Sequence, residues 1–434
     1  MKNKLPLLLP ALIFAVPVQA TEMDKIEHII VIYLENHSFD NLYGTFPGVE
    51  GIAHATLQQA QQIDLKGNPY QTLPAVPKDK RFPDNLPNQP FEINQFIAPN
   101  EKTRDLVHRF YQHQAQINGG KMNRFAAVSD AGALTMGHYR GEELPLWSYA
   151  KRFTLADNFF QAAYGGSFLN HQWLICACTP HYENAPERLK VQLNEQGELI
   201  KDGAITPDNF VVNTLQPFEQ PYDAKELDAE KHLPLQTAVT IGDRLSDKSI
   251  SWTWFSGGWN DAIAGNPAQN FQYHHQPFVY FKNYAEGSAA REEHLKDEAD
   301  FLEGIEEGNL PAVSFYKPIG DLNEHPGYAD LLSGEQHIAD ILHKIEQSSL
   351  WKNSVVIVTY DEFGGFWDHV SPPKLDRWGA GNRVPTLIIS PFAKQGYVDH
   401  TMYDTTSILK LIETRFNLPP LTERDAQATP LFLK

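Results

Sequence analysis

The stretch Ile29-Ile30-Val31-Ile32-Tyr33-Leu34 decides the class of fold. Six consecutive apolar residues, most of them β-branched, predict a strand buried on both faces, as in a parallel or mixed sheet covered by helices. A second run of this kind spans residues 354–360. Further strands and helical stripes alternate along the chain, for example a strand at 386–390 and a helix at 335–348. This alternation predicts α/β layers around one extended sheet.

The composition is that of an acidic globular protein, and the amino end predicts export. Lys and Arg total 36 against 54 Asp and Glu, so the formal net charge of the 434 residues is −18. This balance disfavours binding to nucleic acid. At the amino end, two lysines, an apolar stretch and a Val-Gln-Ala ending predict a signal peptide over residues 1–20. We therefore expect export to a bacterial periplasm or secretion, with no transmembrane helix in the mature chain, 21–434.

Two features in the middle of the chain bear on its organisation. Cys176 and Cys178 lie two residues apart on a predicted helix over 168–177. Side chains at positions i and i+2 of a helix do not face each other, so we expect two buried free thiols rather than a disulfide. Residues 182–232 are polar and irregular, which predicts an insertion or a lid.

Polar pairs follow the two most apolar runs. Glu35-Asn36 comes directly after the first run, and Asp361-Glu362 after the second. In open α/β sheets, ligand sites form beyond the carboxyl ends of the strands. Carboxylate and amide oxygens are ligands for hard cations, so the four groups predict one divalent ion; ordinary solvated loops are the alternative. Oxygen ligands suit Ca²⁺, Mg²⁺ or Mn²⁺, and Zn²⁺ is also compatible.

Gly165-Gly166-Ser167 is a tight turn before the helix predicted over 168–177. Glycines allow a sharp turn, and the first N–H groups of a helix attract an anion. This arrangement suits a serine nucleophile that attacks phosphorus; the alternative is that Ser167 only caps the helix. The sequence lacks the GxSxG, HExxH and Walker A patterns, which disfavours an acyl-transfer triad, a zinc protease and a P-loop.

Several of the 17 histidines flank Gly, Pro or Asp rather than lie on apolar stripes. They include His274-His275, His325 and the pair Asp368-His369. Histidine can donate to phosphate oxygens and protonate a leaving alkoxide near neutral pH. For each histidine alone, a structural or surface role is the alternative.

Four segments together resemble the phosphoesterase family that joins bacterial acid phosphatases with bacterial and plant phospholipases C. They are residues 26–44 (IEHIIVIYLENHSFDNLYG), 108–125 (HRFYQHQAQINGGKMNRF), 157–180 (DNFFQAAYGGSFLNHQWLICACTP), and the block of 323–326 with 360–373 (YDEFGGFWDHVSPP). The resemblance spans nearly all of the mature chain, in the family's order.

The resemblance implies an alkaline phosphatase-like α/β/α sandwich around a large, mostly parallel sheet, with 21–434 as one catalytic domain. It also implies that Ser167 is the nucleophile and forms a phosphoserine intermediate. One divalent cation would be held by Glu35, Asn36, Ser167, Asp361 and Glu362. The phosphate would be surrounded by His108, His274, His275 and His325, one of them acting as the acid. Asn170 would contact the substrate or the transition state.

Three functions follow from these observations. The leading one is an acid phosphatase of broad phosphomonoester specificity, because Ser at position 167 and its flanking residues resemble that branch. The second is a phospholipase C for phosphatidylcholine-type lipids, in transient contact with a lipid surface. Seven aromatic residues near His274 would then line a choline cage, unless they pack in the core; they are Trp254, Phe255, Trp259, Tyr273, Phe278, Tyr280 and Phe281. The third is a non-catalytic secreted binding protein.

Overall fold

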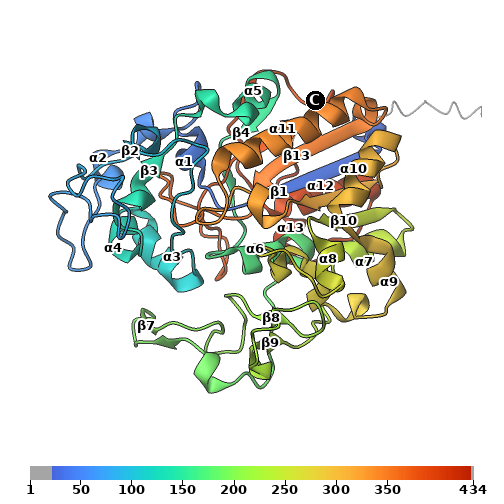
Figure 1. Cartoon of the computed structure of the whole chain (residues 1–434), viewed down its shortest axis with the longest axis horizontal. Helices are drawn as coiled ribbons and strands as arrows, with labels where there is room; N and C mark the ends of the chain where they lie inside the picture. The colour runs from blue at the N-terminus through green and yellow to red at the C-terminus, as the bar shows by residue number, and fades with distance from the viewer. Residues whose placement is uncertain (1–21, 432–434) are drawn as a thin grey trace, which may run out of the picture.

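The computed structural model describes residues 22–431, so the predicted signal peptide lies outside the described residues. One eight-stranded sheet forms the centre of the chain (Figure 1). In spatial order its strands are β11 (Leu295–Asp297), β10 (Trp252–Ser256), β12 (Val313–Lys317), β1 (His28–Leu34), β13 (Ser354–Tyr360), β14 (Thr386–Ile389), β4 (Thr154–Ala156) and β15 (Tyr397–Asp399).

The two apolar runs form neighbouring strands at the middle of this sheet. β1 pairs in parallel with β12 on one side and with β13 on the other. Strand β14 is the one antiparallel member, because it runs against both β13 and β4. Every residue of β13, and all of β1 after its first residue, is buried. Side chains alternate between the faces of a strand, so both faces of the sheet are covered.

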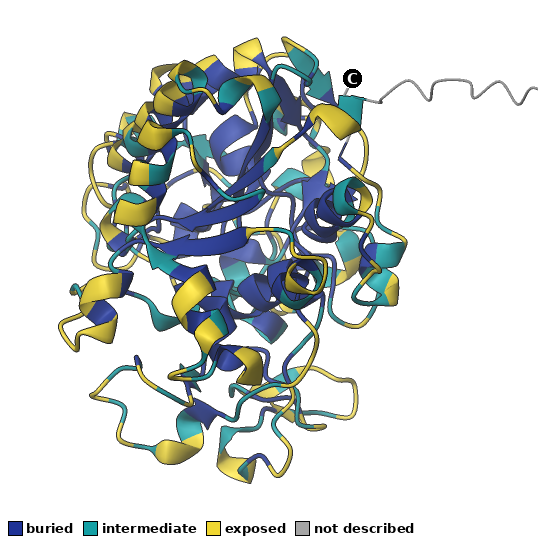
Figure 2. Ribbon diagram, turned by 90° about the vertical axis from the view of Figure 1, so that its right-hand side faces the viewer, coloured by how far each residue is buried: buried dark blue, intermediate teal, exposed yellow. Residues whose placement is uncertain are grey.

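Helices form a layer on each face of the sheet. α11 (Leu331–Gln347) contacts α5 (Pro145–Arg152) and α10 (Glu298–Glu307) in one layer. α6 (Ser167–Cys176) contacts α12 (Thr406–Phe416) and α7 (Ile241–Asp247) in the other. Figure 2 shows the buried strands between helices whose outer faces are exposed. The predicted three-layer α/β/α sandwich is confirmed.

The remaining helices are short. They are α1 (Phe39–Tyr43), α2 (Leu57–Ala60), α3 (Phe110–Ile117), α4 (Phe125–Val128), α8 (Trp259–Ile263), α9 (Ala289–His294) and α13 (Glu423–Ala426). Among the described residues, no helix combines the length and the apolar character that crossing a bilayer requires.

Residues 182–232 lie to one side of the sandwich, below it in Figure 1. They are mostly irregular and contain two small sheets. The strands are β6 (Gln192–Leu193) with β7 (Leu199–Lys201), and β8 (Gln216–Pro217) with β9 (His232–Leu233). Other short pairs are β2 (Phe91–Glu92) with β3 (Gly137–His138), and β5 (Phe159–Phe160) with β16 (Tyr403–Asp404). The segment is thus an appendage of the sandwich, and a lid function stays a prediction.

The prediction of two free thiols is wrong. Cys176 and Cys178 form a disulfide, with their Cα atoms 5.1 Å apart. Helix α6 ends at Cys176, and Ala177 takes a left-handed conformation with φ of 47°. The chain therefore turns out of the helix between the two cysteines. The i, i+2 argument fails because it assumed that the helix continues through Cys178.

Candidate active site

Ser167 begins helix α6 directly after two closely packed glycines. Gly165 has a φ of +86°, and a Cβ there would lie 2.6 Å from the backbone N of Phe110. A Cβ on Gly166 would lie 2.8 Å from the carbonyl O of His108. Glycine at both positions therefore lets the segment 108–110 pack against the turn, which places His108 beside Ser167.

Three buried side chains that do not line the cavity described below hold this turn. His113 Nδ1 accepts a hydrogen bond of 3.0 Å from the Gly165 N–H. Burial lowers the pKa of His113 to about 3, so the ring is the neutral acceptor that this bond requires. Asn170 accepts from the Ala163 N–H at 3.0 Å and donates to the Gly166 carbonyl at 3.1 Å. His171 Nδ1 donates to the Ser167 carbonyl at 2.8 Å. These bonds give Asn170 a role in holding the turn, and its predicted contact with substrate stays a prediction.

The hydroxyl of Ser167 does not cap the helix. The N-cap residue is Gly166. Ser167 Oγ lies 3.2 Å from Glu35 Oε2, 3.2 Å from Asn36 Oδ1 and 3.1 Å from Glu362 Oε1. Glu35 and Asn36 follow β1, and Glu362 follows the adjacent strand β13. The carboxyl ends of the two central strands therefore bring these predicted groups to the hydroxyl, and the capping interpretation is wrong.

This group of oxygens fits a hard divalent cation. Both carboxylate oxygens of Asp361, next to Glu362, are buried and have no hydrogen-bond partner in the described part of the chain. Burial and the charge of Glu35 raise the pKa of Asp361 well above its usual range. A buried carboxylate without a partner is costly, and a bound cation would compensate it. Carboxylate, amide and hydroxyl oxygens are also the donors that such ions prefer.

The second oxygen of Glu35 faces two nitrogen atoms. Glu35 Oε1 lies 2.5 Å from Lys317 Nζ and 2.8 Å from His275 Nε2. Burial raises the pKa of Glu35, but the charges of Lys317 and His275 outweigh it and hold that pKa well below its usual range. Sequence analysis missed Lys317. The sequence shows only that a lysine directly follows residues 312–316, which predict a buried strand.

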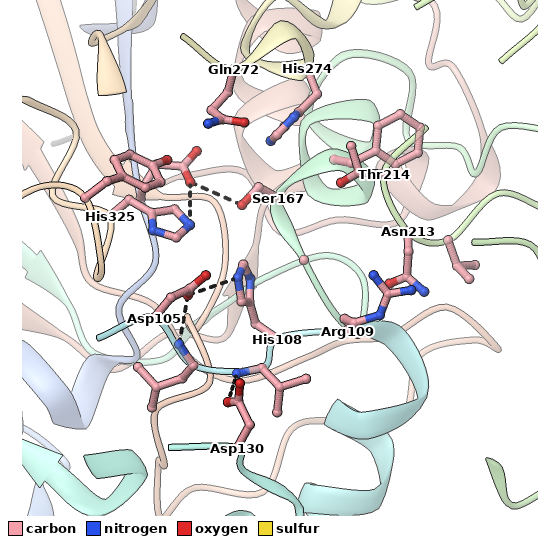
Figure 3. Close-up of a pocket in the computed structure, with 17 residues that line it drawn as sticks. Asp105, His108, Arg109, Asp130, Ser167, Asn213, Thr214, Gln272, His274 and His325 are labelled. Carbon is pink, nitrogen blue, oxygen red and sulfur yellow. Dashed lines mark hydrogen bonds and ion pairs between the residues drawn. The ribbon is translucent and has the colours of Figure 1, made fainter. Parts of the chain in front are cut away.

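A cavity of about 450 Å³ opens in front of Ser167 (Figure 3). Its wall includes His108, His274 and His325. His275 does not line it and instead lies behind Glu35. The structure therefore separates the predicted pair, with His274 at the cavity and His275 as a partner of Glu35. The insertion 182–232 contributes Val212, Asn213 and Thr214 to the far wall.

Two of these histidines have defined hydrogen-bond partners. His108 Nδ1 contacts Glu362 Oε1, and its Nε2 lies 3.5 Å from Asp105 Oδ1. Burial lowers the pKa of His108, but the charges of Glu362 and Asp105 outweigh it and hold the pKa well above its usual range. His325 Nδ1 lies 2.6 Å from the Pro326 carbonyl, which can only accept. The proton is therefore on Nδ1 of His325, and its Nε2, 3.9 Å from Glu35 Oε2, faces the site.

Two further groups near the cavity have the composition of metal sites. Ligand atoms of Asp105, His108 and His325 lie within 4.8 Å of one another, as do those of Glu35, His171 and His275. Both groups border the predicted oxygen site. Side chains of the types that can bind metal ions are thus concentrated around Ser167.

The seven aromatic residues near His274 do not form a cage. None of them lines the cavity. Six are buried in the core: Trp254, Phe255, Trp259, Phe278, Tyr280 and Phe281. Tyr273 is partly exposed. The alternative of core packing is confirmed for these six, and the structure does not support the choline cage.

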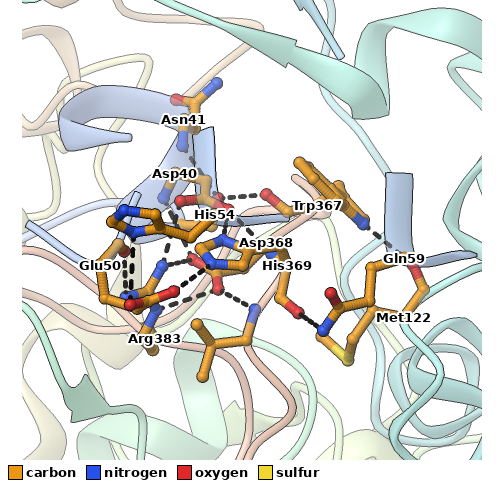
Figure 4. A network of polar contacts seen from close by, with 12 residues as sticks. Asp40, Asn41, Glu50, His54, Gln59, Met122, Trp367, Asp368, His369 and Arg383 are labelled. Atoms are coloured by element: carbon orange, nitrogen blue, oxygen red, sulfur yellow. Dashed lines mark hydrogen bonds and ion pairs between the residues drawn. The ribbon is translucent and has the colours of Figure 1, made fainter. Parts of the chain in front are cut away.

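A buried ion-pair network contains the Asp368-His369 pair (Figure 4). Arg383 lies 3.0 Å from both Asp368 Oδ1 and Asp40 Oδ1, and is fully buried. His369 Nδ1 lies 2.6 Å from Asp40 Oδ2. Asp40 follows the Glu35-Asn36 turn, and Asp368 follows Glu362. The network therefore joins the two chain segments that leave the site.

Comparison with known proteins identifies the family. A sequence model described as "Phosphoesterase family" matches residues 26–419. The chain belongs to the Phosphoesterase family. The match covers all four segments on which the resemblance was based, so the expected family is confirmed. It also supports the predicted enzyme class, a hydrolase acting on phosphoester bonds.

Curated relatives of this Phosphoesterase-family chain are phospholipases C. Non-hemolytic phospholipase C of Pseudomonas aeruginosa is 22% identical over 91% of the chain and 54% of its own length. Phospholipase C B of Mycobacterium tuberculosis is 25% identical over 92% and 74%. Non-specific phospholipase C6 of Arabidopsis thaliana is 24% identical over 93% and 71%. The chain thus spans about half of the first relative and nearly three quarters of the other two.

Solved structures resemble the Phosphoesterase-family chain only weakly. A protein in the alkaline phosphatase superfamily from Vibrio parahaemolyticus aligns over 77% of this chain and 74% of its own. The sequence identity is 10% and the TM-score 0.37. A score this low carries no argument about the site.

Proposed function

We propose that this chain is a cation-dependent hydrolase of phosphomonoesters with Ser167 as its nucleophile. One observation carries the proposal: Ser167 Oγ lies within 3.2 Å of Glu35, Asn36 and Glu362 oxygens, at a cavity lined by three histidines. A serine hydroxyl surrounded by acidic oxygens next to a dipole-positive helix end is suited to attack on phosphorus.

A divalent cation at these oxygens would acidify a coordinated hydroxyl and offset the charge of the phosphoryl group. In the proposed reaction, Ser167 Oγ forms a bond to phosphorus while the bond to the leaving oxygen breaks, and the proton of the hydroxyl passes to a carboxylate beside it, such as Glu362 at 3.1 Å. A histidine of the cavity wall gives its proton to that oxygen, so the leaving group departs as an alcohol. Water then attacks the phosphoserine and gives a proton back to the histidine, while the bond between Ser167 Oγ and phosphorus breaks. Ser167 regains its proton from the carboxylate, and phosphate is released. Glu35 and Asn36 fix the hydroxyl on one side, and the Gly165-Gly166 turn fixes it on the other.

The wall of the cavity offers polar contacts to a leaving group. It includes Arg109, Asn213, Thr214 and Gln272, beside two aromatic rings, Phe168 and Tyr328. A second candidate, a phospholipase C, is favoured by the curated relatives, which are phospholipases C. Both candidates share the hydrolysis of a phosphoester and differ in which ester reaches Ser167.

The test compares two substrates. p-Nitrophenyl phosphate and phosphatidylcholine vesicles are each assayed with and without a chelator. Chelator-sensitive release of p-nitrophenol with little phosphocholine supports the proposal. If phosphocholine is the main product, the phosphomonoesterase proposal is wrong and the phospholipase C candidate is supported. No hydrolysis of either ester, with cation supplied, leaves a binding protein.

We also infer that the protein is exported to the periplasm or secreted. The Cys176–Cys178 disulfide agrees with an oxidising compartment, where such bonds persist. Fractionation of cells that produce the full chain tests this, and retention in the cytoplasm would contradict it.

A further inference from the structure

We propose that Lys317 makes the site selective for dianionic phosphomonoesters over monoanionic phosphodiesters. The inference rests on the proposed function, because it concerns the ester that Ser167 attacks. Lys317 does not line the cavity and is a positioning and charge-balancing residue that acts through Glu35.

Lys317 is a buried cation directly behind the site. It is the last residue of β12, which pairs with β1, and its side chain is fully buried. Its Nζ lies 2.5 Å from Glu35 Oε1 and 5.3 Å from the centre of the Tyr33 ring. Within 22–431, Glu35 is the acidic group with which it forms an ion pair. Since the other oxygen of Glu35 lies 3.2 Å from Ser167 Oγ, one carboxylate separates Lys317 from the nucleophile.

Charge counting shows what Lys317 contributes. Glu35, Asp361 and Glu362 bring three negative charges to the site. A divalent cation would bring two positive charges and Lys317 the third, so this set is neutral. His108 and Asp105, which pair at the edge of the site, add charges of opposite sign that cancel. Without Lys317 the same set carries a net charge of −1. Because these groups are buried, solvent ions screen them weakly.

Loss of this positive charge weakens the binding of each substrate in proportion to the negative charge that the substrate carries. The second ionisation of a phosphomonoester has a pKa of about 6, so the ester carries close to two negative charges above neutral pH. A phosphodiester carries one. Coulomb energies scale with the product of the charges, so loss of one positive charge costs the monoester about twice as much free energy as the diester. Lys317 thus favours the monoester.

A purely structural role makes a different prediction. If Lys317 only held Glu35 in place, its loss would impair both esters equally and would weaken cation binding. If it balances charge, its loss removes repulsion between Lys317 and the cation. Cation affinity is then maintained or increased, and the loss of activity falls mainly on the monoester.

The experiment measures both quantities in K317M and K317Q. Affinity for Mn²⁺ is measured by titration calorimetry on chelator-stripped protein. kcat/KM is measured at pH 8 for p-nitrophenyl phosphate and bis(p-nitrophenyl) phosphate. Where diester turnover is too slow, inhibition constants for inorganic phosphate and dimethyl phosphate replace it. We expect the monoester-to-diester ratio to fall about tenfold or more, with Mn²⁺ bound at least as tightly as by the wild type.

R383M is the matched control. Arg383 is also a fully buried cation between carboxylates, but its partners are Asp40 and Asp368, away from Ser167. Its substitution should lower thermal stability and leave the ratio unchanged. K317R keeps the charge, so its ratio should stay near that of the wild type.

Three outcomes would overturn the inference. They are an equal loss on both esters in K317M, weaker Mn²⁺ binding in K317Q, or a changed ratio in a folded K317R. If the neutral variants do not fold, the monoester-to-diester ratio of K317R decides between the two roles. This variant keeps the positive charge but changes the geometry around Glu35. A wild-type protein that cleaves neither ester refutes the proposed function instead, which separates the two failures.

Discussion

The hydroxyl of Tyr360 donates a hydrogen bond of 2.6 Å to Glu324 Oε2. Tyr360 directly precedes Asp361, and Glu324 directly precedes His325, so this bond links the cation-site strand to a histidine of the cavity wall. Burial and the nearby Glu335 carboxyl raise the pKa of Glu324 well above its usual range. The bond therefore joins two buried groups that water does not reach.

We expect Y360F to lower both stability and activity. It leaves a buried carboxyl oxygen without its donor, which costs about 1–3 kcal/mol of unfolding free energy. kcat should fall several-fold because His325 loses its link to β13. Urea unfolding and steady-state kinetics measure the two effects. Y43F is the control, because the buried Tyr43 hydroxyl has no hydrogen-bond partner among the described residues. If Y360F and Y43F lose the same unfolding free energy and the same kcat, the Tyr360–Glu324 bond has no role in the site.

S167A should fold normally and lose at least about 10³-fold in kcat/KM, because it removes the atom that forms the bond to phosphorus. The hydroxyl makes no helix cap, so the melting temperature should change little. S148A, whose hydroxyl bonds within helix α5, serves as the control. Near-wild-type phosphatase rates in S167A would rule out Ser167 as the nucleophile.

Removal of the cation should abolish activity, and added divalent ions should restore it. D361N should weaken Mn²⁺ binding about tenfold or more because it removes one charged ligand. The same variant should be more stable than the wild type without cation, since it removes a buried carboxylate that has no hydrogen-bond partner within residues 22–431. Calorimetry tests the weaker Mn²⁺ binding, and melting curves with and without chelator test the higher stability. D340N, an exposed substitution on α11, should change neither.

Alkaline pH should destabilise the protein through His369. Burial lowers the pKa of His369, but its bond to Asp40 and the negative charge there outweigh this and raise it to about 9. Between pH 6.5 and 9 the folded state therefore keeps a proton that the unfolded state has lost. The stabilisation is fully present below pH 6.5 and is lost as pH rises through 9, by on the order of 3 kcal/mol.

H369Q isolates this contribution. Urea unfolding from pH 6 to 10 should show a smaller decrease in stability for H369Q than for the wild type. Identical pH profiles would show that the ring is not protonated in the folded state.

The sequence predicted the parts of the molecule that depend on local pattern. β1 and β13 were predictable because central strands are buried on both faces and so read as unbroken apolar runs. Glu35 and Glu362 were found because polar residues directly follow those runs. The sequence did not predict the roles of Lys317, His113 and His171. A single buried polar residue has no local signature, because its role depends on contacts that only the folded structure shows. The disulfide was missed because the left-handed Ala177 could not be read from an apolar helix.

The placement of β1 between β12 and β13 has a consequence for synthesis. The earliest strand of the described chain lies between two of its late strands, so the residues that meet at Ser167 come from both ends of the polypeptide. A nascent chain on the ribosome lacks Asp361 and Glu362, two of the five residues predicted to hold the cation, until translation passes position 362. Fragments that stop short of position 362 should therefore be inert.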